Sequence, residues 1–321
     1  MYYIFSILAL LCWSGSDLFS KMGTREKDKN SHWKVVFAVG LIMGIHFFIT
    51  LIGGAVIDST VGVDGVPKVL ASLLYTDFRL IDFFNYLPVA GLYILAMVFG
   101  YIGLRYIELS ISSPICNSSG ALAFLLCVLF GIFSTDDITP VSIIGIVMIT
   151  VGIIALGFVE QHEDEEVRQA RQERANRKYA KSILAFLLPI SYLIIDALGT
   201  VGDEFIFSDR SPVTITDYAA NSAFELTFFI LAIFAFIWVK FVKKDSIFKG
   251  NKHLYFGGLC ETIGQVFYMA VMFSDFSVGM VIISAYCAIS VLWSRIFLKE
   301  KMSWKHYAVI ALVIAGIVIL G

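Results

Sequence analysis

Four carboxylic acids lie inside long apolar stretches of this chain: Asp17, Asp196, Glu225 and Glu261. An ionisable side chain at the centre of a bilayer costs at least about 2.5–3.5 kcal/mol on insertion scales, so each acid needs a reason to be there. Lysine and arginine occur at the ends of these stretches, which leaves the acids without an evident internal cation. They are either protonated, as burial favours, or neutralised by an arriving species. This pattern indicates a proton path or a cationic substrate.

Two of these acids follow an aromatic residue at the same spacing. Trp13 comes four residues before Asp17, and Tyr192 comes four residues before Asp196. Residues i and i+4 share one face of a helix, so each pair places a ring beside a carboxylate. A ring face and a carboxylate together suit an ammonium group or a quaternary amine. The alternative is that both rings are membrane-interface anchors and that Asp17 lies near a helix end beside Lys21.

Two further stretches carry polar stripes, Asp217, Asn221 and Glu225 in one and Glu261, Gln265 and Tyr268 in the other. Asp217 is also explained as a solvated first residue of its helix. Hydrogen bonds between membrane helices contribute about 0.6 kcal/mol on average, too little to offset a buried carboxylate. The stripes therefore favour a water-filled cavity.

We accordingly predict one set of substrate-binding residues: Trp13, Asp17, Asn117, Tyr192, Asp196, Asn221, Glu225, Glu261, Gln265, Tyr268 and Tyr286. Asp196, Glu225 and Glu261 are also the candidates for proton coupling. Two prolines, Pro114 and Pro189, remove backbone hydrogen bonds and predict kinks. Breaks in helices commonly border the binding sites of carriers, although a kink with only a packing role is equally compatible with the sequence.

The composition indicates which elements hold these residues. Of the 321 residues, 58% are hydrophobic and 16% charged, with a mean hydropathy of +0.82, against about 25% charged residues in soluble domains. A spanning helix needs roughly 20 apolar residues, and ten stretches qualify or nearly so: Tyr2–Ser20, Trp33–Ile57, Phe84–Ile107, Leu109–Phe133, Thr139–Val159, Ser182–Val201, Thr214–Lys240, Leu254–Phe273, Ser277–Leu298 and Trp304–Gly321. A short interfacial helix is expected within Asp58–Asp82.

A highly charged segment, residues 160–181, divides the chain into two halves, residues 1–159 and 182–321. Thr139–Gly157 aligns with Ser303–Gly321 without a gap, and Gly152 then matches Gly316. Each half has five apolar stretches, an odd number, so the second copy enters the membrane the opposite way up. The predicted fold is an all-α membrane protein of ten transmembrane helices, built as two inverted five-helix repeats with a site between them.

Two segments carry a family resemblance, SISSPICNSSGALAFLLCVLFGIFSTDDITPVSIIGIVMITVGIIALG and its repeat SAYCAISVLWSRIFLKEKMSWKHYAVIALVIAGIVILG. The acidic residue that opens the turn before the last helix is Glu300, and the first helix has Trp13 and Gly15 in an aromatic-x-Gly pattern. The chain resembles the drug/metabolite transporter superfamily, in particular its ten-helix EamA-type members. The resemblance implies alternating access around a central cavity between two five-helix bundles. It implies no particular substrate.

The distribution of basic residues orients the chain. All but three of the 24 lysines and arginines fall in the connections after the odd-numbered helices or beside them; the exceptions are Lys68, Arg79 and Arg210. Because cytoplasmic loops are enriched in basic residues, the central linker is predicted inside and both termini outside a plasma (inner) membrane. This departs from many ten-helix EamA-type members, which carry both termini in the cytoplasm.

The predicted function is secondary active transport of a small cationic or zwitterionic metabolite, with proton coupling as an option. An exporter of amino acids or toxic amines is the runner-up, and a lipid-linked flippase of the same fold is an alternative that would open sideways to lipid. A receptor without transport also remains. The sequence has no enzyme signature, and its five cysteines lie in apolar stretches, so we expect no enzyme activity, cofactor or metal site. The expected partners are the substrate and membrane lipids, without nucleic acid, and a monomer is favoured.

Overall fold

The computed structural model describes residues 2–25, 27–134, 139–175, 177, 183–248, 252–272 and 282–320. Over these ranges the chain is helical, with irregular connections. The helices are α1 (Tyr2–Gly23), α2 (Ser31–Thr60), α3 (Lys68–Leu74), α4 (Leu80–Gly103), α5 (Leu109–Cys116), α6 (Ser119–Leu129), α7 (Pro140–Gln161), α8 (Glu165–Ala175), α9 (Ile183–Phe207), α10 (Asp217–Ile237), α11 (Lys252–Met272), α13 (Tyr286–Trp293) and α14 (Trp304–Leu320).

Seven helices of the described ranges are long and apolar enough to cross a membrane: α1, α2, α4, α5 with α6, α7, α9 and α10. Two shorter apolar segments follow, Ile282–Leu298 and Trp304–Ile319. Each of the ten expected stretches lies on helix over most of its described part; the exceptions include residues 104–107, 117–118, 130–133 and 214–216. The beginning of the expected Ser277–Leu298 helix falls outside the described residues. The expected short helix in the first long connection is confirmed as α3.

The fourth stretch is interrupted, and this affects the cavity described below. Helices α5 and α6 are separated at Asn117 and Ser118, just after Pro114, which has no backbone N–H to donate. The Ser118 hydroxyl donates to the Pro114 carbonyl at 2.7 Å, so the break leaves that oxygen paired. The Asn117 side-chain amide donates to the carbonyl of Ser284 at 2.7 Å. Since a second interruption occurs next to it, at Ala285, two helix breaks from different halves face each other.

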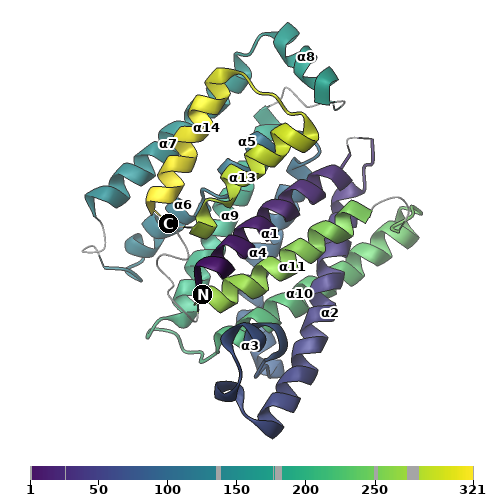
Figure 1. Cartoon of the computed structure of the whole chain (residues 1–321), viewed down its shortest axis with the longest axis vertical. Coiled ribbons are helices and arrows are strands. Elements are labelled where there is room, and N and C mark those ends of the chain that lie inside the picture. Colours follow the sequence, from purple (N-terminus) through teal and green to yellow (C-terminus); the bar gives the residue numbers. More distant parts are fainter. Residues whose placement is uncertain are drawn as a thin grey trace.

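Helices of the first half pack mainly against helices of the second half. Helix α1 lies along α11 and α4 along α9, while α2 packs on α10 and α7 on α14 (Figure 1). Gly152 and Gly316, which match in the alignment of the two sequence segments, both lie in the α7–α14 contact, where an added Cβ would approach Val313 and Gly145, respectively, within 3 Å. Pro189 lies within the uninterrupted helix α9.

The linker helix α8 and the short helix α3 lie towards opposite ends of the molecule, α8 at the top and α3 near the bottom of Figure 1. Arg177 of the linker donates to the Thr24 carbonyl at 2.9 Å, just beyond the end of α1. Between these ends, large apolar side chains cover the outside; Ile52 and Ile154 are each 69% exposed. An apolar outer surface of this kind suits a bilayer rather than water.

Candidate functional site

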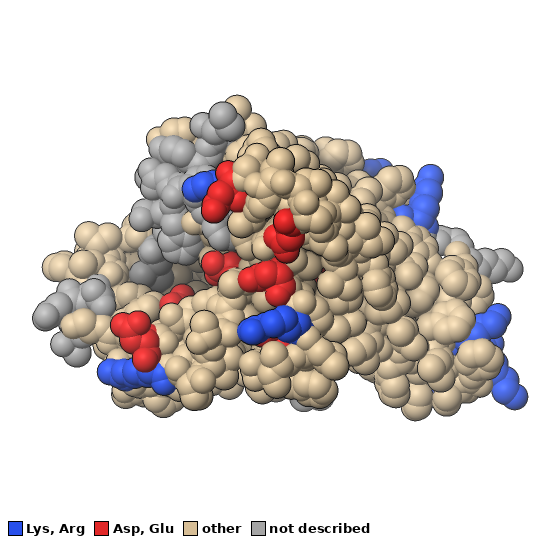
Figure 2. Space-filling view, turned by 90° about the horizontal axis from the view of Figure 1, so that it is seen from below, with Lys and Arg blue, Asp and Glu red and all other residues tan. Residues whose placement is uncertain are grey.

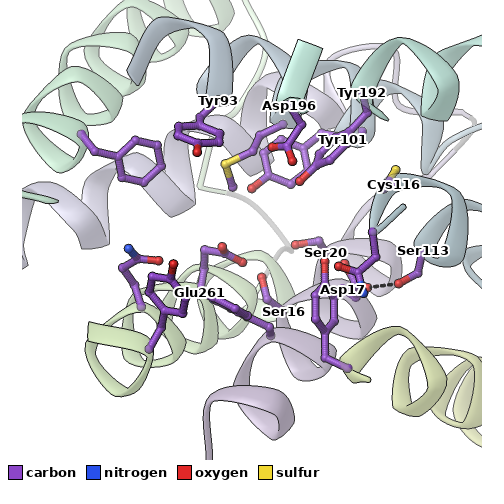
Figure 3. A pocket seen from close by; sticks show the side chains of 18 of the residues that line it. Ser16, Asp17, Ser20, Tyr93, Tyr101, Ser113, Cys116, Tyr192, Asp196 and Glu261 are labelled. Atoms are coloured by element: carbon purple, nitrogen blue, oxygen red, sulfur yellow. Dashed lines mark hydrogen bonds between the residues drawn. The ribbon is translucent and has the colours of Figure 1, made fainter. Parts of the chain in front are cut away.

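A central cavity of about 370 Å³ lies between helices of both halves. All of the predicted substrate-binding residues except Glu225 line it. Its residues come from α1, α4, α5, α9, α10, α11 and α13, and Figure 3 shows two sets of side chains that face each other across the space. One set includes Ser16, Asp17, Ser20 and Glu261, and the set on the other side includes Asp196 (Figure 3).

Asp17 is held by two serine hydroxyls from different helices. Its Oδ2 accepts hydrogen bonds from Ser113 of α5 at 2.6 Å and from Ser290 of α13 at 2.7 Å. Lys21, one turn further along α1, has a fully buried side chain that donates to the carbonyls of Leu104 and Ile107 at 2.6 and 2.5 Å. Asp17 therefore points into the cavity, and the ammonium group of Lys21 joins α1 to the α4–α5 turn.

Asp196 of α9 has a similar environment. Its Oδ2 accepts a hydrogen bond from the hydroxyl of Ser119, the first residue of α6, at 2.6 Å. Asp17 and Asp196 each come four residues after an aromatic ring that also lines the cavity, Trp13 and Tyr192. Both carboxylates thus sit beside a ring and accept a serine hydrogen bond from the interrupted α5–α6 segment.

Aromatic rings form much of the wall between the carboxylates. The Trp13 ring lies 5.3 Å from that of Tyr268 and 5.9 Å from that of Tyr286, measured between centroids. Tyr192 packs against α4 at Gly100, where an added Cβ would come within 2.9 Å of its ring. These ring faces present the negative side of their quadrupoles, which attracts cations.

A chain of hydrogen bonds connects the cavity to Glu225, which lies behind its wall. The Gln265 amide donates to Asn221 at 3.1 Å, and the Asn221 amide donates to Glu225 Oε1 at 3.2 Å. The same oxygen lies 2.7 Å from Nδ1 of His46, whose Nε2 lies 3.1 Å from the Leu73 carbonyl. Glu225 is fully buried and has a partner that titrates. The acids that line the cavity differ from Glu225 because no histidine is among the described lining residues.

Several lining residues, mainly from α4 and the end of α9, were not among the residues predicted from the sequence. Asp203 lines the cavity and accepts a hydrogen bond from the Tyr86 hydroxyl at 2.6 Å. Tyr93 and Tyr101 of α4 line it as well. The signal was present as a seven-residue spacing, which returns to nearly the same helix face: Tyr86, Tyr93 and Gly100 on α4, and Asp196 and Asp203 on α9.

The cavity has an open end and a closed end. Asp203 and Asp217 are partly exposed and Phe207 is 42% exposed, whereas Ser20 and Leu109 at the other end are each about 1% exposed. The end of the molecule viewed in Figure 2 is hollowed, and acidic side chains gather near its centre. The open end of the cavity, its mouth, is therefore acidic, and the closed end lies beside the buried Lys21.

The charges that line the cavity are of one sign. Five carboxyl side chains line it, Asp17, Asp196, Asp203, Asp217 and Glu261, and the described lining residues include no lysine, arginine or histidine. Within the described part of the chain, no three His, Cys, Asp or Glu side chains converge on a possible metal position. The carboxylates are thus spread along the cavity rather than gathered at one point.

Three buried polar atoms of the lining have no hydrogen-bond partner: Nε1 of Trp13, Oγ of Ser20 and the hydroxyl of Tyr101. Buried polar groups are normally paired, so unpaired ones facing a cavity mark places where water or a ligand can bind. The two hydroxyls can accept as well as donate a hydrogen bond, while the indole N–H only donates.

A bundle of helices long and apolar enough to cross a membrane, arranged around a polar cavity, is typical of an integral membrane protein. Residues 183–321 match the model of the EamA-like transporter family. The match covers the second half of the chain, and the family that it resembles there is part of the drug/metabolite transporter superfamily and consists generally of non-enzymatic transporters. The resemblance inferred from the two segments is confirmed for the second of them. The comparison with curated proteins gives no match.

Proposed function

We propose that the protein is a secondary active transporter that moves a small cationic or zwitterionic metabolite across the plasma membrane by alternating access. One observation carries the proposal: five carboxyl groups and no basic side chain among the described residues that line the central cavity. In surroundings of low dielectric, uncompensated carboxylates attract a mobile cation strongly. The unpaired indole N–H of Trp13 can donate to a ligand carboxylate, which keeps a zwitterion within the proposal.

The arrangement as two inverted repeats is part of this proposal and is supported by the packing. If the halves are equivalent, α1 corresponds to α9 and α4 to α11, so the α1–α11 contact corresponds to α9–α4. Both contacts are present, and the α2–α10 and α7–α14 pairs map onto themselves. Such a pattern suits a two-fold axis in the membrane plane, with the substrate site near the midplane. Asp17 and Asp196 would then be symmetry partners.

Alternating access is supported by the difference between the two ends of the cavity. The Asp203 end is partly exposed, while the opposite end is closed where Lys21 joins α1 to the α4–α5 turn. In the alternative state, this contact would open and the Asp203 end would close. The interrupted helices beside the cavity can supply hinges, since breaks in carrier helices commonly border the substrate site.

Proton coupling is proposed through Asp196, Glu225 and Glu261. Asp196 and Glu261 line the cavity directly, so a proton and a cationic substrate would compete for the same oxygens. Glu225 would act through Asn221 and Gln265, the hydrogen-bonded chain that reaches the cavity. A carboxylate that alternately holds a proton and a cation couples the two movements in opposite directions.

Two other transport functions use the same architecture. An exporter of amino acids or toxic amines would bind in the same cavity and differ in direction. A flippase for a lipid-linked substrate would need an apolar seam open to lipid. The carboxylates are enclosed by α1, α4, α9, α10 and α11, which favours a solute over a lipid. Flux of a water-soluble amine into proteoliposomes, measured beside lipid scrambling, distinguishes these cases.

We further propose that both termini are extracytoplasmic and the linker with α8 cytoplasmic, as the distribution of basic residues indicates. The separation of α8 and α3 at opposite ends supports two distinct sides (Figure 1). A reporter fused after Gly321 is expected to be active only outside the cytoplasm. Cytoplasmic activity would overturn the orientation and leave the cavity assignment standing.

The test of the function is uptake into proteoliposomes from a panel of amines, amino acids and nucleosides, with a thermal-shift screen to choose the ligands. Asp196→Asn and Glu261→Gln are expected to lower uptake of accepted cations at least tenfold. Glu204→Gln is the matched control, since Glu204 is exposed and outside the cavity lining. If both cavity variants fold and keep wild-type uptake of every accepted substrate, the site assignment is wrong.

A further inference from the structure

We propose that the substrate is a linear polyamine with at least two ammonium groups, bound along the cavity with its terminal nitrogens at separate carboxylates. This inference rests on the proposed function and narrows its substrate class. Its basis is the distribution of charge along the cavity together with two unpaired hydroxyls between its ends. A compact monovalent cation would use only a part of this lining.

The acidic residues form an inner group, Asp17, Asp196 and Glu261, and an outer group, Asp203 and Asp217. Asp17 and Glu261 of the inner group face the same space and interact electrostatically. Asp203 and Asp217 of the outer group also interact electrostatically and lie at the partly exposed mouth. One ammonium group at either position leaves the other carboxylates without a counter-ion. A ligand with several positive charges can neutralise both groups at once.

The geometry of α9 gives the distance between two of the carboxylates. Asp196 and Asp203 are seven residues apart on one helix and both line the cavity. At 1.5 Å per residue, their Cα atoms are separated by about 10 Å along the helix axis. Asp203 accepts a hydrogen bond from the Tyr86 hydroxyl and Asp196 from the Ser119 hydroxyl, and these bonds orient the two carboxylates separately. Two ammonium groups about 10 Å apart, as in an extended triamine, match this separation.

The wall between the two groups suits the remainder of such a chain. Tyr93, Tyr101 and Tyr192 present rings and hydroxyls along it (Figure 3). Methylene groups pack on ring faces, and a central ammonium group gains a cation–π interaction there. The Tyr101 hydroxyl and Ser20 Oγ are both buried and unpaired and can accept from an amine N–H. Five carboxyl groups line the cavity against three unpaired donors, none of which is charged, so the balance favours a polycation over a zwitterion.

The experiment measures binding to the purified full-length protein in detergent for a chain-length series: a primary monoamine, a short diamine, an extended triamine, and the triamine's analogue with one terminal amine replaced by hydroxyl. The triamine is expected to bind at least tenfold more tightly than the monoamine, and the hydroxyl analogue to lose most of this gain. Asp203→Asn is expected to reduce the affinity for the triamine about tenfold and to reduce that for the monoamine clearly less, because the monoamine can still bind at the inner group.

Two further variants keep the result interpretable. Glu204→Gln removes a charge next to Asp203 but outside the cavity lining, and should leave the whole series unchanged. Asp217→Asn repeats the Asp203 test on another helix if Asp203→Asn proves unstable by thermal unfolding. Equal affinities for the monoamine and triamine, or an equal loss for both in Asp203→Asn, overturn the polyamine inference alone. Absence of binding for every amine and every zwitterionic amino acid overturns the proposed function as well.

Discussion

The carboxylate of Asp17 accepts a hydrogen bond from the hydroxyl of Ser290 at 2.7 Å, across 273 positions of sequence. Ser290 lies on α13 and is fully buried, and the second donor to the same oxygen is Ser113 of α5. One acid of α1 is thus oriented by both interrupted segments, so that any movement of these segments changes the position of the acid. This geometry makes the serine pair a sensitive point for testing the cavity.

Ser290→Ala is expected to weaken binding of a cationic substrate by about tenfold, because a hydrogen bond to a charged group contributes roughly 1.5–3 kcal/mol. Equilibrium binding to the purified protein measures this change. Ser222→Ala serves as the control, since Ser222 is an equally buried serine that donates to Thr76 and does not line the cavity. Equal losses in both variants would contradict an orienting role for Ser290.

The His46–Glu225 pair allows structural and coupling roles to be separated. Breaking a buried pair on one side costs about 3–5 kcal/mol. Glu225→Leu should therefore lower thermal stability more than the double variant His46→Phe/Glu225→Leu, which leaves neither partner behind. Thermal unfolding of the single and double variants measures the coupling energy, and additive effects would show that the pair contributes nothing.

Glu225→Gln tests the proposed proton path. A glutamine keeps a hydrogen bond to His46 but cannot carry a proton between states. The expected result is a folded protein that binds substrate normally, while the rate of transport loses much of its dependence on a pH gradient. An unchanged response to the gradient would remove Glu225 from the path and leave Asp196 and Glu261 as candidates.

Cys116 provides a native probe of the cavity. It lines the cavity and is partly accessible, whereas Cys127 and Cys287 are about 1% and 0% exposed. A small cationic thiol reagent should modify Cys116 well before the other two, and a bound substrate should slow that modification about tenfold. Mass spectrometry of the peptides provides the measurement for each cysteine in one sample. Protection of Cys127 or Cys287 instead would place the substrate elsewhere.

The sequence predicted the acids of the cavity because an ionisable residue stands out in an apolar helix, whatever it packs against. Asp17, Asp196 and Glu261 were identified in this way and line the cavity. The tyrosines of α4 were not, since tyrosine is common in membrane helices for other reasons, including anchoring at the interface. Only the tertiary arrangement distinguishes a cavity tyrosine from an anchor.

The position of Glu225 illustrates a second limit. Asp217, Asn221 and Glu225 were read as one stripe, but two steps of four residues rotate a position by about 80° around the helix axis. This rotation brings Glu225 behind the wall, where it meets His46 of a helix distant in sequence. Likewise, Pro114 indicated a distortion, but the meeting of its broken helix with the break at Ala285 depends on how the two halves pack.

Asp245 lies outside the membrane-spanning segments and gives a prediction on pH. Hydrogen bonds from Lys34 and Asn30 hold the pKa of the Asp245 carboxyl below its usual value of 3.8. A lowered pKa in the folded state means that the stabilisation is present above pH 3.8 and is lost as pH falls through the lower folded value. Because the side chain is 36% exposed, we expect at most about 1 kcal/mol.

Asp245→Asn should therefore lower the melting temperature slightly at pH 7 and have no effect at a pH well below 3.8. Thermal unfolding in detergent at both pH values measures this difference. Asp209→Asn is the charge control, because Asp209 is exposed and outside this ion pair. A deficit that persists unchanged in acid would indicate that the Asp245 side chain acts through its shape and not its charge.

The close approach of α2 and α10 depends on glycine at position 40. A Cβ at Gly40 would lie 2.4 Å from the carbonyl oxygen of Phe228 and 2.8 Å from Cβ of Ala232. Gly40→Ala must therefore separate the helices, with an expected loss of roughly 1–3 kcal/mol in stability. Gly91→Ala is the matched control in another membrane helix, where an added Cβ meets nothing within 4 Å. It should be neutral or stabilising by up to about 1 kcal/mol, as alanine favours the helix. Equal melting temperatures for Gly40→Ala and Gly91→Ala would refute the packing argument. Because α2 carries His46 and α10 carries Asn221, separating the two helices in Gly40→Ala should also weaken the hydrogen-bonded chain between Glu225 and the cavity.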